Sequence, residues 1–149
     1  MIIVNIIMET KDETDNDFVH KIKENFPLFH IKTFSTDFNG IIGQVNVEKI
    51  YDECETDEKL EETLGEVYIE DKLTDFSKLY PNKVFGYIEM DCHGGLCLYE
   101  GFAVKNGEII FKCEYQENGH VNILKKINNK YNGPFFEPFT RKFLYDNGY

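Results

Sequence analysis

The sequence predicts an α+β fold in which a central, mostly antiparallel sheet ends in a β-meander and the helices pack on one face. Two observations lead to this prediction. Apolar residues recur at helical spacing over residues 56–81 and then at a spacing of two from Lys83 onward. In addition, Asn106-Gly107 separates two alternating runs, which is a strong hairpin signal. The 149 residues contain no long linker and no internal repeat, so we expect one globular domain over residues 1–149.

The first third of the chain predicts a strand, a helix and two further strands. Residues 2–8 are an apolar run typical of a buried strand, and the pattern leaves open whether it pairs in parallel. Residues 14–27 predict a helix, because their apolar side chains share one face and a proline ends the segment. Residues 28–35 and 41–47 predict two strands joined by a turn.

The rest of the chain predicts helices on either side of the meander. Residues 56–81 read as two helices divided at Gly65. Three strands follow, over residues 83–91, 96–105 and 107–115. A further helix has its apolar positions at Val121, Leu124, Ile127 and Tyr131, and a last helix opens at Pro138.

The charge of the chain is concentrated in one segment. Between Asp52 and Asp75, eleven acidic residues stand against Lys59 and Lys72, a local charge of -9 out of a total of -11. This excess of negative charge argues against nucleic acid and anionic membrane surfaces as direct ligands, because both would be repelled.

The composition predicts a cytoplasmic protein with reduced thiols. No apolar run approaches the roughly 20 residues that span a bilayer. The apolar start lacks a basic region and a cleavage site, so it reads as a strand and not as a signal peptide. Four scattered cysteines are too few for a secreted disulfide framework.

The segment DCHGGLC, residues 91–97, raises the question of a metal or thiol site. A two-residue loop, Gly94-Gly95, would place Cys92 opposite Cys97, which suits a disulfide or a shared metal. A three-residue loop that includes His93 would pair Cys92 with Leu96 instead.

The hydrophobic pattern favours the three-residue loop. That register gathers apolar residues on one face and avoids placing Glu89 opposite Glu100, a destabilising like-charge pair. Cys92 and Cys113 would then be core thiols, and Cys97 would point to the other face. The spacing therefore predicts no metal site and no cofactor.

The leading functional hypothesis is a non-catalytic module that binds a basic protein through its acidic helices. Carboxylates between the apolar positions would line the solvent side of these helices and attract cationic surfaces from a distance. The expected partner-binding residues are Glu58, Glu61, Glu62, Glu66, Glu70 and Asp71.

The alternative is a small enzyme or ligand binder that uses the outward face of the sheet near the His93-Gly94-Gly95 turn. Its candidate residues are Tyr87, Glu89, Asp91, His93, Cys97 and Tyr99. A homodimer through the same tyrosine-rich face is a third interpretation.

Two chemical roles also stay open. Cys97 could act with His93. Glu100 is either a carboxyl whose pKa burial raises, or a partner of a basic residue in the C-terminal helix, such as Arg141.

The block YPNKVFGYIEMDCHGGLCLYEGFAVKNGEII, residues 80–110, resembles a pattern in bacterial immunity-type proteins encoded beside polymorphic toxins. In those proteins two strands are joined by a Gly-Gly turn near an acidic residue, and a glycine turn follows. The matching positions are Tyr87, Asp91, Gly94, Gly95, Asn106 and Gly107. The resemblance implies a cytoplasmic binder that neutralises a toxin domain, often a basic nuclease.

Overall fold

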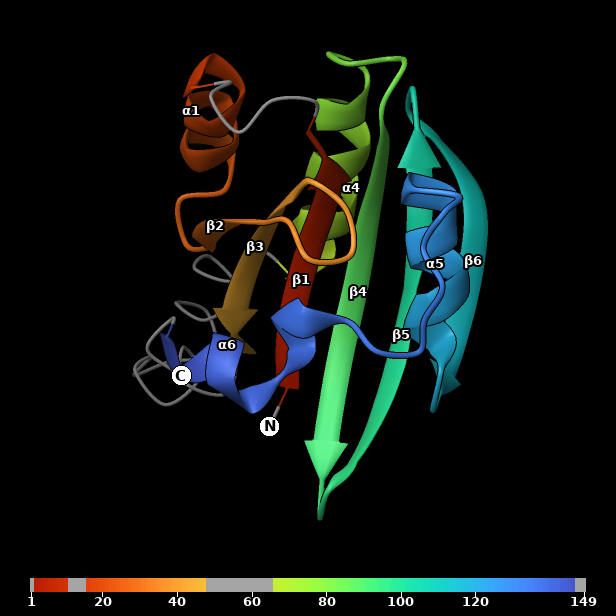
Figure 1. Ribbon diagram of the computed structural model, residues 1–149. Coiled ribbons are helices and arrows are strands. Elements are labelled where there is room, and N and C mark those ends of the chain that lie inside the picture. The colour runs from red at the N-terminus through yellow and green to blue at the C-terminus, as the bar shows by residue number, and fades with distance from the viewer. Residues whose placement is uncertain (1, 11–15, 48–65, 147–149) are drawn as a thin grey trace.

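A computed structural model describes residues 2–10, 16–47 and 66–146 of the chain. Its six strands form one sheet in the order β2-β3-β1-β4-β5-β6, and all neighbouring strands are antiparallel (Figure 1). The strands are β1 (Ile2–Glu9), β2 (His30–Phe34), β3 (Gly40–Asn46), β4 (Val84–His93), β5 (Leu96–Lys105) and β6 (Glu108–Gln116). The predicted α+β class and the meander of β4, β5 and β6 are confirmed.

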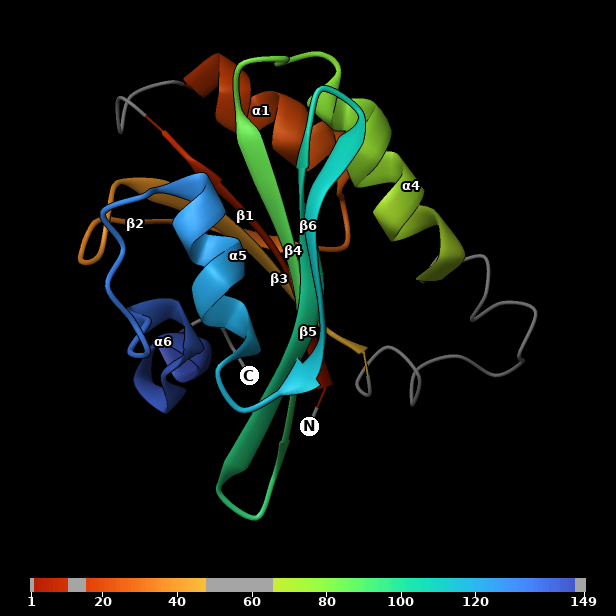
Figure 2. The ribbon, with the colours of Figure 1, turned by 90° about the vertical axis from the view of Figure 1, so that its right-hand side faces the viewer.

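The helices cover both faces of this sheet. They are α1 (Asn16–Asn25), α4 (Glu66–Ser77), α5 (Gly119–Ile127) and α6 (Arg141–Asp146), and a short 3-10 turn, η1 (Glu137–Phe139), precedes α6. Figure 2 shows α1 and α4 on one side, here called the α4 face, and α5 with α6 on the other, the α5 face. Within the described residues no helix is long and apolar enough to cross a bilayer.

The prediction that the helices pack on one face is therefore wrong. The reason lies in β1, whose side chains are apolar in both directions: Ile6 and Met8 face α1 and α4, whereas Ile3 and Ile7 face the opposite layer. All four side chains are fully buried. A central strand of this kind needs a covering layer on each side.

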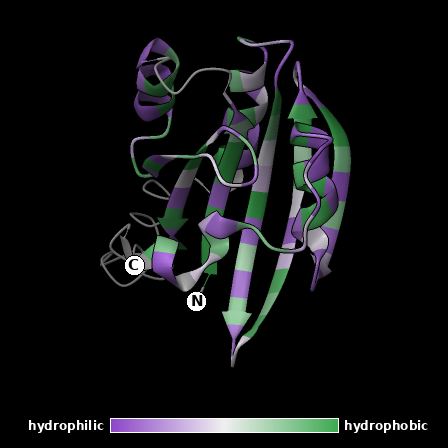
Figure 3. Ribbon diagram, viewed as in Figure 1, coloured by the Kyte–Doolittle hydropathy of each residue, from purple (hydrophilic) through white to green (hydrophobic). Residues whose placement is uncertain are grey.

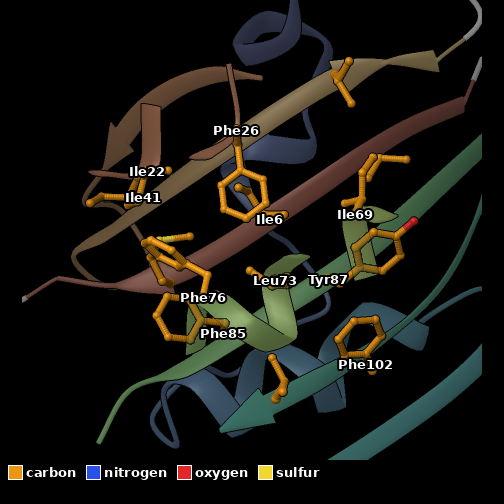
Figure 4. Close-up of a cluster of buried hydrophobic side chains, with 14 of the residues drawn as sticks. Ile6, Ile22, Phe26, Ile41, Ile69, Leu73, Phe76, Phe85, Tyr87 and Phe102 are labelled. Carbon is orange, nitrogen blue, oxygen red and sulfur yellow. The ribbon is translucent and has the colours of Figure 1, made fainter. Parts of the chain in front are cut away.

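The core of the α4 face combines aromatic rings with aliphatic side chains (Figure 4). Leu73 and Phe76 of α4 point toward the sheet, where the Phe76 ring lies 5.6 Å from that of Phe85 and 5.7 Å from that of Phe26. The second predicted helix is confirmed as α4, which the structure describes from Glu66 to Ser77. The first of the two predicted helices lies outside the described residues.

The core of the α5 face depends on small residues in the strands. Ile123, Leu124 and Ile127 of α5 are buried against β4 and β5, and hydrophobic and hydrophilic segments alternate along the helix (Figure 3). A Cβ atom on Gly86 would lie 2.7 Å from Ile127 Cδ1, so any larger residue here would force the end of the Ile127 side chain to move. Gly86 pairs with Ala103, another small residue.

A buried amide pair ties the C-terminal segment to the α5 face. Gln44 Nε2 donates to Asn5 Oδ1 at 2.9 Å and to the carbonyl oxygen of Pro138 at 3.1 Å. Asn5 Nδ2 donates to the Ile88 carbonyl at 3.0 Å. Both amides are fully buried, so these bonds fix where the segment before α6 lies.

The β4–β5 hairpin adopts the two-residue loop and not the predicted three-residue one. Gly94 and Gly95 have φ values of 57° and 84°, which glycine accepts readily. Cys92 lies directly opposite Cys97, and the two form a disulfide. The predictions of a three-residue loop and of a reduced Cys92 and Cys97 are therefore wrong, whereas Cys113 is a buried free thiol as expected.

Two glycines explain why the hydrophobic pattern misled. In the observed register Gly86 and Gly101 lie on the α5 face among Ile88, Met90 and Ala103. A pattern that counts only large apolar residues does not recognise these glycines as buried positions, and so it does not assign them to the core face. The cost of placing Glu89 opposite Glu100 is roughly 1 kcal/mol or less, which is small beside the burial of one large side chain, about 1.5–3 kcal/mol.

The close packing at Gly101 gives a test of this register. A Cβ atom there would lie 1.8 Å from the carbonyl oxygen of Tyr87, so Gly101→Ala should lower the free energy of unfolding by at least about 2 kcal/mol. Gly94→Asn is the control, because asparagine tolerates the left-handed turn position and nothing lies within 4 Å of its Cβ. Urea denaturation should place the control within about 0.5 kcal/mol of the parent. Equal losses in both variants would contradict the register.

Candidate functional site

The α4 face changes character along the β4–β5 hairpin. The rings of Tyr87 and Phe102 are buried and stacked, with their centroids 5.1 Å apart, in the core that α4 covers. The next rows toward the tip are Glu89 opposite Glu100, Asp91 opposite Leu98, and the exposed pair His93 and Leu96. We name Glu89, Asp91 and Glu100 the carboxylate patch; its three side chains are half-buried.

The charges of the patch act on one another and on β6. His93 Nε2 lies 2.7 Å from Asp91 Oδ1, a buried oxygen that has no other hydrogen-bond partner among the described residues. The pKa of Tyr115 is raised by burial first, then by its hydrogen bond to Glu89 and by the negative charges of all three patch carboxylates. Tyr115 thus contacts the patch, which sequence reasoning missed because a bulge shifts the register of β6 beside Tyr99 and Gly101.

The patch lies beside a projecting tip. Among the described residues, β1 pairs with β4 as far as Asp91, and β6 pairs with β5 as far as Tyr99. Residues 92–98 therefore extend beyond both neighbouring strands, as Figures 1 and 2 show. Leu96, at the end of this extension, is 51% exposed.

The predicted acidic-helix site falls partly within the described residues. Glu70 and Asp71 are exposed on α4, on the same face of the sheet as the carboxylate patch. Asp75, one helical turn further, pairs with Lys78 at 3.3 Å. The other predicted residues cannot be placed in this way. Glu58, Glu61 and Glu62 lie outside the described residues, and so does the side chain of Glu66.

The residues of the predicted alternative site lie on two different faces. Glu89, Asp91 and His93 lie together on the α4 face, where Tyr87 is buried beneath α4. The two-residue loop moves the other two members to the α5 face. There Cys97 is in the disulfide, and the Tyr99 ring lies 4.2 Å from that of His120.

Glu100 does not occupy the apolar environment predicted for it. It lies on the α4 face, whereas α6, which begins at Arg141, packs on the α5 face, so the expected pairing with that helix does not fit the fold. In the described part of the chain no lysine or arginine forms an ion pair with Glu100 or Asp91, and no group of three side chains could hold a metal ion.

A separate cavity of about 350 Å³ lies beside the start of α5. Its lining residues are Gln116, Asn118, Val121, Asn122, Gly133 and Pro134. His120 lies next to it, buried, with Nε2 2.6 Å from the carbonyl oxygen of Pro134 and with no partner for Nδ1 among the described residues. Burial lowers the pKa of His120 from its ordinary 6.5, and the contact with Pro134 opposes this shift only in part.

Comparison with known proteins assigns neither a family nor a fold relative. No family model matches the chain, and no curated protein or solved structure is similar to it. The function must therefore be inferred from the residues and the geometry of the chain.

The buried imidazole predicts a pH dependence of stability. Below pH 6.5 the unfolded chain protonates His120 while the folded chain resists, so the free energy of unfolding should fall as the pH drops from 6.5 toward the lower folded-state pKa. The loss is at most about 1.4 kcal/mol per pH unit. In His120→Gln, whose amide can still donate to Pro134, this component should be absent. Urea denaturation of both proteins between about pH 8 and pH 5 gives the free energy of unfolding of each as a function of pH. If this free energy falls equally in both proteins, His120 is not the source of the pH dependence.

Proposed function

We propose that this chain is a non-catalytic module that binds a basic protein partner on its α4 face. The observation that supports this most directly is the carboxylate patch beside the projecting hairpin tip. Three half-buried carboxylates from two neighbouring strands converge there, and Glu70 and Asp71 of α4 add exposed negative charge on the same side of the sheet.

Charge and apolar surface support different parts of the recognition. The net charge of -11 would attract a cationic surface and would raise the association rate more than the affinity, and Glu70 and Asp71 place part of this charge on the α4 face. The exposed Leu96 and half-buried Leu98 at the tip supply apolar area that a partner could cover. A partner of this chemistry has lysine or arginine side chains around a small apolar depression.

The resemblance to immunity-type proteins suggests the same chemistry for the partner. A basic toxin domain would be attracted to the α4 face, and a binder of this kind needs no catalytic residues. The matched Gly-Gly turn forms the tip beside the carboxylate patch, and the matched Asp91 is a member of the patch. We therefore propose inhibition of a basic toxin domain as the biological role.

The carboxylate patch can be tested with a labelled lysine- and leucine-containing peptide as a model basic ligand. The double variant Glu89→Gln/Glu100→Gln removes two charges and relieves the like-charge pair, so the fold should be retained. Fluorescence anisotropy should show binding weakened by about three- to tenfold, with a flatter dependence on salt.

The matched control removes two charges far from the tip. Asp17→Asn/Glu24→Gln changes exposed residues of α1, which lies at the other end of the molecule (Figure 2). This control should bind the peptide almost as the parent does. If both double variants weaken binding equally, attraction is due to net charge alone and the proposed site is wrong.

A further inference from the structure

We propose that Cys92–Cys97 is a redox-active disulfide whose reduction by a dithiol opens the hairpin tip and loosens the docking of α6. This inference is independent of the proposed binding of a basic partner. It rests on where the disulfide lies in the sheet and on what packs against it.

The disulfide joins β4 and β5 at the base of the projecting hairpin tip. Among the described residues, β4 pairs with β1 as far as Asp91 and β5 pairs with β6 as far as Tyr99. Beyond these points the two strands pair with each other at Cys92–Cys97 and His93–Leu96, and Leu98 pairs with Asp91. A two-stranded ribbon on its own is marginally stable in water. The turn also contains two adjacent glycines, which gain much backbone freedom when the ribbon opens.

The sulfur atoms also form part of the surface on which α6 rests. Leu144 of α6 is buried in a small cluster with Ile3 and Met90. Cys92 and Cys97 pack against the same cluster. Because Leu144 and the two cysteines contact the same cluster, a change in the position of the cysteines should alter the contact of α6 with the sheet.

The disulfide is accessible to a reductant. Cys92 and Cys97 are half-buried and lie beside the exposed residues 93–96. Cys113, in contrast, is buried, and its sulfur accepts a hydrogen bond from Gln116 Nε2. Reagents should therefore reach the disulfide in the folded state but not Cys113.

The reaction is ordinary thiol–disulfide exchange. A thiolate of the dithiol attacks one sulfur, forms a mixed disulfide and displaces the other cysteine as a thiolate. The second thiol of the reductant then displaces the remaining cysteine. The reductant leaves as its own disulfide, two electrons pass to the protein, and Cys92 and Cys97 take up the two protons.

The test is amide hydrogen exchange on the full chain before and after treatment with dithiothreitol, with alkylation mass spectrometry to follow Cys92 and Cys97. Complete reduction under native conditions should raise exchange by about tenfold or more in residues 92–98 and 141–146. Exchange in β1 and β3 should not change. Unchanged exchange in either responding segment after full reduction would overturn the proposal, as would reduction that occurs only together with global exchange.

Two variants separate this disulfide from other thiols. Cys92→Ser/Cys97→Ser should exchange rapidly in both segments, whether or not dithiothreitol is present. Cys113→Ser should respond as the parent does. A double serine variant that exchanges as slowly as the oxidised parent would also refute the proposal.

Discussion

The register of the β4–β5 hairpin is the constraint on which the rest of the structure depends. The Gly94-Gly95 turn makes Cys92 face Cys97, and the period of two then decides the face of every residue in both strands. A three-residue loop would shift β5 by one residue and turn Glu100 into the apolar layer beneath α5 and α6. Burying a carboxylate there costs several kcal/mol. The like-charge pair Glu89 and Glu100 costs roughly 1 kcal/mol or less, so the observed register is favoured despite it.

The elements were predictable from the sequence, but their faces were not. Periodicity and turn chemistry identified the six strands, and the Asn106-Gly107 turn joins β5 to β6 as expected. The faces of β4 and β5 place Gly86 against Ile127 and Gly101 against the Tyr87 backbone, and at Gly101 a side chain would clash with that backbone. Nothing in the local pattern distinguishes such a glycine from one that interrupts a strand. The composition of the sheet can therefore be predicted more securely than its packing.

The candidate site was predictable to a similar degree. Glu89, Asp91 and His93 alternate along one strand, so their common face follows from the period of two alone. Glu100 joins them only in the two-residue register, and Tyr115 only because β6 contains a bulge. The signal that could have fixed the register was the spacing of Cys92 and Cys97 on either side of the glycine pair. The cost of placing Glu89 opposite Glu100 favoured the other register. In the structure, a hydrogen bond from Tyr115 reduces this cost at Glu89.

The same alternation places two chemical features back to back on one ribbon. Odd-numbered residues of β4 present carboxylates and an imidazole to the α4 face, and even-numbered residues present Met90 and Cys92 to the α5 face. A partner bound to the carboxylate patch would thus leave the disulfide on the opposite side of the sheet. Both features nevertheless depend on the pairing of residues 92–98, since this pairing positions His93 beside Asp91 and holds the cysteines against Leu144. Opening the tip therefore changes both faces at once, and the stability of one short ribbon links the charge of one layer to the packing of the other.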